Sequence, residues 1–146
     1  MSTRRLWKSI GTAVLALGLL HSSAGAADLS KPAFVTAADK ICAASNKKIE
    51  AAALTAFASL GPNDQPSPAH LKAFAVKAVP LLLAQVKDLR KLSPPKADKA
   101  AIKKLFDGVE VAANKIKKDP QEILSDNLFS SLDKQAKVYG FKVCGD

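Results

Sequence analysis

The chain has 146 residues and a formal net charge of +9, with 22 lysines and arginines against 13 aspartates and glutamates. This length predicts a single domain with room for an apolar core. Arg90 is the only arginine after residue 26, and lysine lacks the planar fork that reads phosphates and guanine edges bidentately. The composition therefore argues against nucleic acid as a partner.

The first 26 residues have the three parts of a secretory signal. A basic start with Arg4, Arg5 and Lys8 precedes an apolar run over residues 10–20. A run of about eleven residues is too short to cross the roughly 30 Å apolar layer of a membrane as a permanent helix. The small residues at positions 24–26 then fit a signal peptidase site. We expect cleavage after Ala26 or Ala27, and an exported protein of the periplasm, the cell envelope or the extracellular space.

Two alternatives concern the same segment. A retained N-terminal anchor is one alternative, and the short apolar run disfavours it. The other concerns the export route, which stays open because residues 3–7 (TRRLW) also resemble a twin-arginine signal. Removal of the signal, with its three basic residues, leaves residues 27–146 with 19 basic and 13 acidic side chains and a net charge of +6. We expect no transmembrane segment in this mature chain.

The first predicted helix runs from Pro32 to Leu60 and is ended by Gly61 and Pro62. Its apolar stripe follows steps of three and four and consists mostly of small residues, which allow close approach of a neighbouring helix. The stripe contains Val35, Ala38, Cys42, Ser45, Ile49, Ala53, Ala56 and Leu60, with Phe34, Ile41 and Phe57 at its margins.

The second predicted helix begins at Ser67-Pro68, a hydroxyl cap followed by proline, and reaches Leu92. Its predicted core face contains Leu71, Phe74, Ala78, Leu82, Val86 and Leu89. Pro80 lies inside this helix, on the side opposite the core face, and must bend it. A helix curved around its own core is one interpretation of that bend, and a functional hinge is the other.

The third predicted helix runs from Pro95 to Lys118, and the fourth begins at the capping sequence Asp119-Pro120 and ends at Gly140. The third has an apolar face of Ile102, Leu105, Phe106, Val109, Ala113 and Ile116. The fourth has a predicted inner stripe of Leu124, Leu128, Leu132, Gln135 and Tyr139. No alternating pattern typical of strands occurs, so the sequence predicts an all-α domain.

Short links between consecutive helices favour an antiparallel up-down four-helix bundle. In that topology the first helix starts at the pole where the fourth ends. Cys42 lies near the start of the first helix, and Cys144 follows the end of the fourth. The topology therefore predicts a Cys42–Cys144 disulfide that closes the domain, which an exported protein can form.

Residues 34–42 (FVTAADKIC) and 139–145 (YGFKVCG) resemble the two ends of small exported bacterial helical proteins of unknown function. In such proteins the two cysteines look like a structural pair, which the resemblance places on Cys42 and Cys144. The resemblance implies no activity and no substrate. This chain also lacks a lipid-attachment cysteine after its apolar run, so a lipoprotein role does not transfer.

The mature chain offers no recognisable catalytic, metal or cofactor site. His70 is its only histidine, so neither a metal pair nor a histidine-dependent nucleophile has the residues it needs. Asp107 and Glu110 lie on the third helix beside Lys103 and are interpreted as ordinary surface ion-pair partners. We expect a protein that is not an enzyme and has no cofactor.

Binding functions remain open. Seven basic residues around the link between the second and third helices could form an anion-binding patch that attracts a cell-envelope polyanion or an anionic surface. They could equally be an ordinary solvated surface. They are Lys87, Arg90, Lys91, Lys96, Lys99, Lys103 and Lys104. The small residues of the first helix facing the bent second helix could instead leave a cavity for a hydrophobic ligand. The sequence thus predicts an exported helical protein that acts through a binding surface, for a polyanion, a protein partner or a small ligand.

Overall fold

The computed structural model describes residues 27–145, and the predicted signal peptide over residues 1–26 lies outside this range. Between residues 27 and 145 the chain has four α-helices and no strand, which confirms the predicted all-α class. The helices are α1 (Lys31–Ala56), α2 (Pro68–Leu89), α3 (Lys99–Lys118) and α4 (Asn127–Tyr139), with two short 3-10 turns, η1 (Lys96–Asp98) and η2 (Pro120–Leu124).

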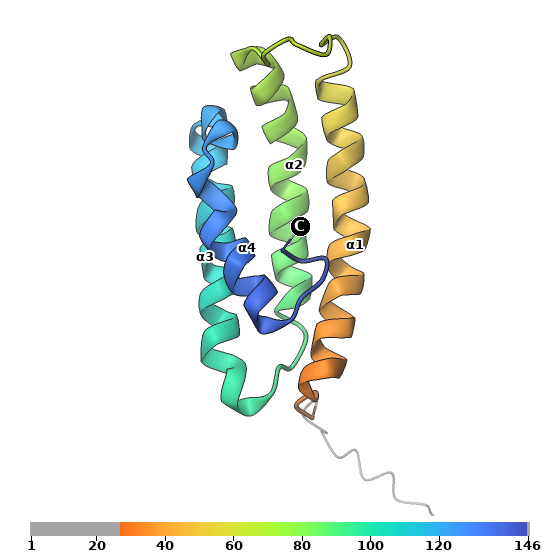
Figure 1. Ribbon diagram of the computed structural model, residues 1–146, viewed down its shortest axis with the longest axis vertical. Helices are drawn as coiled ribbons and strands as arrows, with labels where there is room; N and C mark the ends of the chain where they lie inside the picture. The colour runs from red at the N-terminus through yellow and green to blue at the C-terminus, as the bar shows by residue number, and fades with distance from the viewer. Residues whose placement is uncertain (1–26, 146) are drawn as a thin grey trace, which may run out of the picture.

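Consecutive helices pack on one another, α1 on α2, α2 on α3 and α3 on α4 (Figure 1). Within the described range, α1 and α4 are not a closely packed pair. The C-terminal segment, residues 140–145, instead leaves α4 and crosses to α1 (Figure 1). The domain is therefore closed by this segment rather than by a fourth helix of full length.

Several helix ends follow the predicted capping chemistry. Ser67 caps α2, where its Oγ accepts a hydrogen bond from the backbone N–H of His70 at 3.3 Å. Gly140 ends α4 with a left-handed backbone at φ 116°, a conformation that glycine adopts without steric cost. Other bounds differ from the prediction, because α1 ends at Ala56 and α2 ends at Leu89.

The fourth helix was predicted as continuous from Pro120, and this is wrong. Asp119 does cap a turn there, since its carboxylate accepts from the N–H of Gln121 at 2.9 Å. The turn is only the five-residue η2, however, and Ser125 then adopts an extended backbone at φ −81° and ψ 114° before α4 begins at Asn127.

This break changes which residues of the last segment face the core. The predicted inner stripe fails at two of its five positions, because Leu124 is 55% exposed and Gln135 is exposed, whereas Leu128, Leu132 and Tyr139 are partly buried. Ala136 is the buried residue of α4. A spacing of three and four residues counted from Leu124 cannot continue across a non-helical residue, so the true stripe is set by the residues after the break.

The predicted core faces of α2 and α3 are confirmed, with all six apolar residues of α3 buried or partly buried. The core has two clusters. The one nearer the disulfide contains Phe34, Ala38, Cys42, Val86, Leu89, Ile102, Leu105, Phe106, Ala136 and Phe141. The other contains Ala75, Val79, Ala113 and Ile116. Phe34, predicted at the margin of the first stripe, is fully buried.

α2 is long and apolar enough to cross a membrane by length and composition alone. It also packs between α1 and α3, and 33% of its most apolar stretch is buried, so the expectation that the mature chain has no transmembrane segment stays a prediction. Pro80 lies inside this helix and is exposed, as predicted. A bend at this proline would therefore lie on the solvent side of α2.

Candidate functional site

The C-terminal segment is tied to α1 by the predicted disulfide. Cys42 and Cys144 are bonded, with their Cα atoms 5.2 Å apart across a separation of 102 residues. Cys42 is fully buried, and the described range contains no free cysteine. The bond therefore acts as a covalent closure of the domain, with no thiol left for chemistry.

A carboxylate on α1 adds a second attachment one turn from the disulfide. Asp39 Oδ1 accepts from the backbone N–H groups of Val143 at 3.0 Å and of Cys144 at 3.2 Å, and Oδ2 accepts from Lys142 at 3.0 Å. Three consecutive backbone donors that follow the end of α4 are thereby satisfied by one side chain. Asp39 is thus a structural acceptor that fixes the path of the C-terminal segment.

Three aromatic rings complete this attachment. Phe34 packs edge-on against Tyr139 with centroids 6.2 Å apart and lies 6.0 Å from Phe141. The hydroxyl of Tyr139 donates to Asp98 at 2.8 Å, and burial together with this bond raises the pKa of Tyr139 above its ordinary value of 10.0. The two segments that carry the sequence resemblance, residues 34–42 and 139–145, are therefore in contact with each other.

A groove of about 500 Å³ lies where α1 and α4 do not pack closely, and we call it the α1–α4 groove. All four helices and the C-terminal segment line it. Its apolar lining consists of Ile49, Leu82, Val86, Leu89, Leu105, Phe106, Val109, Phe129, Leu132, Ala136 and Phe141. Cys144 also lines it, so the disulfide segment forms part of the wall. Its volume lies within the roughly 300–1,000 Å³ of small-molecule sites.

Four polar side chains share the lining of the α1–α4 groove: Asn46 and Glu50 from α1, Gln85 from α2 and Asp133 from α4. Glu50 is exposed, and Asn46 and Asp133 are partly exposed, so these three lie toward the mouth. An apolar interior with a few polar groups at defined places is the usual composition of a small-molecule site.

Gln85 has an unsatisfied acceptor. Its Nε2 donates to Cys42 Sγ at 3.0 Å, while its Oε1 is buried with no hydrogen-bond partner within residues 27–145. A disulfide sulfur carries no hydrogen and can only accept, so the amide nitrogen must face Cys42 and the oxygen is the atom left over. A buried polar atom without a partner is rare in native proteins and calls for an explanation.

Two further concavities are present. One of about 490 Å³ lies between α3 and α4 and is lined in part by Lys31, Ile102 and Val138, which is 80% exposed. The other, of about 300 Å³, lies between α1 and α2. The α1–α4 groove differs from both because a large part of its lining consists of residues of the buried core.

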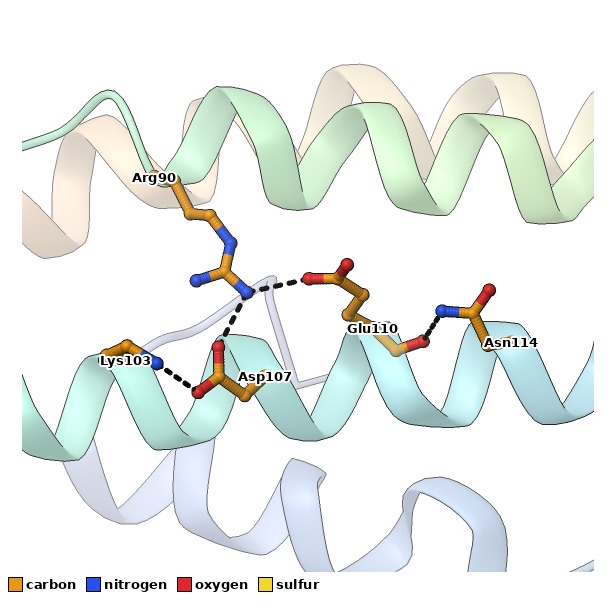
Figure 2. A network of polar contacts seen from close by, with 5 residues as sticks. All are labelled: Arg90, Lys103, Asp107, Glu110 and Asn114. Atoms are coloured by element: carbon orange, nitrogen blue, oxygen red, sulfur yellow. Dashed lines mark hydrogen bonds and ion pairs between the residues drawn. The ribbon is translucent and has the colours of Figure 1, made fainter.

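The structure brings the predicted basic residues to the end of α2, to η1 and to the start of α3, where acids accompany them. Arg90 extends from the end of α2 toward α3, and its guanidinium contacts Asp107 at 2.8 Å and Glu110 at 2.9 Å (Figure 2). Lys103 contacts the other oxygen of Asp107 at 2.7 Å (Figure 2). These contacts hold the pKa of Asp107 below its ordinary value of 3.8, through hydrogen bonds from Lys103 and then Arg90.

Two more members of the predicted anion-binding patch have acidic partners. Lys91 pairs with Asp88 at 2.5 Å, and Lys99 pairs with Asp28 at 2.7 Å. Lys87, Lys96 and Lys104 are exposed, and none of the ion pairs within residues 27–145 includes them. Positive charge is therefore partly balanced within the patch itself, which reduces its attraction for anions.

His70 has a structural role at the start of α2. Its Nδ1 accepts from the N–H of Ser67 at 3.3 Å, and its Nε2 lies 3.1 Å from the hydroxyl of Ser59. These bonds close the capping box of α2 and join it to the end of the α1 region. Within residues 27–145, no group of three or more histidine, cysteine, aspartate or glutamate side chains is placed to hold a metal ion.

Sequence reasoning missed the α1–α4 groove and the roles of Asp39 and Gln85. The groove lies where α1 and α4 do not pack closely, and the sequence carries no clear signal for how closely these two helices approach. Asp39 could have been noticed, because an acid three residues before the buried Cys42 lies on the same side of the helix. Nothing in the sequence marks Gln85.

Comparison with known proteins adds no relative: no protein-family model matches this chain, and neither the curated proteins nor the solved structures gave a match.

Proposed function

We propose that this chain is an exported, non-enzymatic helical protein that carries a small, mainly apolar molecule in the α1–α4 groove. The observation that supports this most strongly is the groove itself, about 500 Å³ in volume and lined by core residues of α2, α3, α4 and the C-terminal segment, with Ile49 of α1 facing them. A fully packed interior would have left no room for such a ligand. Burial of an apolar molecule there is favourable at roughly 25 cal/mol per Å² of surface removed from water.

The proposal includes an antiparallel up-down arrangement of the four helices. The packing of each helix on the next one along the chain supports it. In this arrangement the C-terminal segment returns to α1 and forms one wall of the groove, so that the disulfide keeps the binding site closed on that side.

Export to the periplasm, the cell envelope or the extracellular space is the second part of the proposal, with residues 1–26 as a cleaved signal. The first residues after the predicted cleavage site support it. Leu29 donates its N–H to the carbonyl of Ser93 at 2.8 Å, and Asp28 accepts from the Ser93 hydroxyl at 2.9 Å. A chain cut after Ala26 or Ala27 would keep both contacts. The Cys42–Cys144 bond also suits an oxidising compartment.

Native mass spectrometry of the oxidised protein, purified from its own host, tests the proposal. We expect a bound small molecule on the wild-type protein. Val109 lines the groove, whereas Val111, two residues along the same helix, does not line it and is 58% exposed. The bound mass should therefore be lost in Val109→Trp and kept in Val111→Trp. A wild-type protein without any bound molecule, or equal occupancy of both variants, would count against the carrier function.

A further inference from the structure

We propose that the polar end of the ligand is a protonated amine, so that the α1–α4 groove selects cationic amphiphiles over neutral and anionic ones. This inference rests on the carrier function and specifies its ligand class. It draws on two independent features of the groove: the charge of its polar lining, and the buried acceptor on Gln85.

The charge of the groove is opposite to that of the protein. The chain is rich in lysine and has a formal net charge of +9, yet neither lysine nor arginine lines the groove. Its two ionisable lining residues are both acids, Glu50 on α1 and Asp133 on α4. Asp133 already takes part in another interaction within the protein, so Glu50 is the residue on which the selectivity depends.

Electrostatics in such a place favour a cation. An apolar wall beside a carboxylate lowers the local dielectric constant and strengthens its attraction for a positive group. The same carboxylate repels an anionic head group, and that repulsion is a direct source of discrimination. The carboxylate of a fatty acid would therefore be repelled by the acidic side chain at the mouth of the groove, whereas an ammonium group would form an ion pair with it.

Gln85 supplies the second feature. Its Oε1 is buried without a hydrogen-bond partner within residues 27–145, its amide nitrogen is committed to Cys42 Sγ, and the side chain lines both the α1–α4 groove and the concavity between α1 and α2. The group that would satisfy Oε1 must be a hydrogen-bond donor. An ammonium group with N–H donors meets both requirements, because it can donate to an amide oxygen and pair with a carboxylate. A quaternary ammonium group has the charge without the donors, and so separates the two contributions.

Competition against a neutral dye tests the inference. Nile red, which is uncharged and has no donor, reports occupancy of the groove in the oxidised protein. Four competitors with the same dodecyl chain are added below their micellar concentrations: the primary ammonium, the trimethylammonium, the alcohol and the carboxylate. We expect the primary ammonium to displace the dye at a concentration about threefold to tenfold lower than the carboxylate, with the trimethylammonium between them.

Two variants identify the residues responsible. Glu50→Gln should reduce the preference for the primary ammonium over the carboxylate to the part that Gln85 supplies, and should abolish the preference for the trimethylammonium over the carboxylate. The matched control Glu122→Gln, at a residue that does not line the groove, should keep both preferences. Gln85→Met should abolish the preference for the primary ammonium over the trimethylammonium. Displacement by the alcohol should change little in Glu50→Gln, and this shows that the groove is intact.

The possible failures are distinguishable. If Nile red does not bind the wild-type protein, or binds Val109→Trp equally well, the carrier function itself is refuted. If the dye binds in the groove but the carboxylate competes as well as the primary ammonium, or Glu50→Gln keeps the full preference for the trimethylammonium over the carboxylate, the cationic ligand class is refuted and the carrier function stands.

Discussion

At the scale of single residues, Asp39 is the side chain that fixes the C-terminal segment to α1 by hydrogen bonds. It accepts three backbone hydrogen bonds from residues 142–144, in a segment that has no helical partners of its own. Asp39→Ala should reduce the free energy of unfolding by about 1–3 kcal/mol, because the part-buried donors of Val143 and Cys144 and the exposed donor of Lys142 lose their acceptor. Urea denaturation of the oxidised protein measures this change.

The conservative substitution provides the control. Asp39→Asn keeps Oδ1, the oxygen that accepts from Val143 and Cys144, so its loss of stability should be smaller than that of Asp39→Ala. If both variants unfold at the wild-type urea concentration, the carboxylate does not fix the C-terminal segment.

The Asp107 network makes a prediction about pH. The pKa of Asp107 is lowered in the folded protein from its ordinary value of 3.8, chiefly by Lys103 and Arg90. Its contribution to stability is therefore complete above that ordinary value and is lost as the pH falls through the lower folded-state pKa. Asp107→Asn should lower the urea midpoint at neutral pH and have little effect at about pH 2. A loss of equal size at both pH values would show that the charge of Asp107 is not the cause.

At the scale of the helices, substitution of Pro80 tests whether this proline is a passive feature of α2 or a functional hinge. It removes one hydrogen bond inside α2 and is exposed, so its replacement loses no core packing. If the bend is passive, Pro80→Ala should stabilise the protein by about 1 kcal/mol or more and leave Nile red binding unchanged. Thermal and urea unfolding measure the first effect, and a dye titration measures the second.

Pro68 is the matched control on the same helix. It lies in the first turn of α2, where proline suits the helix, so Pro68→Ala should be neutral or destabilise by about 0.4–1 kcal/mol. Altered dye binding in Pro80→Ala, with an unchanged Pro68→Ala, would favour the hinge.

The elements also show how far sequence reasoning reaches in this protein. The starts of α1, α2 and α3 were predicted to within about four residues, since proline, serine and the apolar spacing all agree there. The break at Ser125 was missed because Asp119 and Pro120 begin a 3-10 turn as readily as an α-helix, and nothing local determines how far the turn continues. The α1–α4 groove is formed by side chains from all four helices and the C-terminal segment, so it depends on tertiary packing that local sequence patterns do not give.

At the scale of the whole molecule, the disulfide contributes both to the stability of the fold and to the wall of the proposed binding site. Its loop of about 100 residues would contribute up to about 4.7 kcal/mol in the chain-entropy model, although measured bonds commonly give about 2–4 kcal/mol. Reduction should therefore lower the urea midpoint. It should also weaken ligand binding, because Phe141 and Cys144 line the groove. Reduced protein that keeps wild-type stability and dye affinity would contradict this coupling.

The most direct test of the carrier function is a Nile red titration of the oxidised protein, with excitation outside the tryptophan absorption band. We expect saturable binding to the wild-type protein and to two exposed-site controls, Leu54→Trp and Val111→Trp. Binding should be lost in the groove-filling variants Ile49→Trp and Val109→Trp, with circular dichroism showing that their helices are intact. Wild-type affinity in both folded groove-filling variants, or no saturable binding to the wild-type protein, would contradict the proposal that this protein carries a small apolar molecule between α1 and α4.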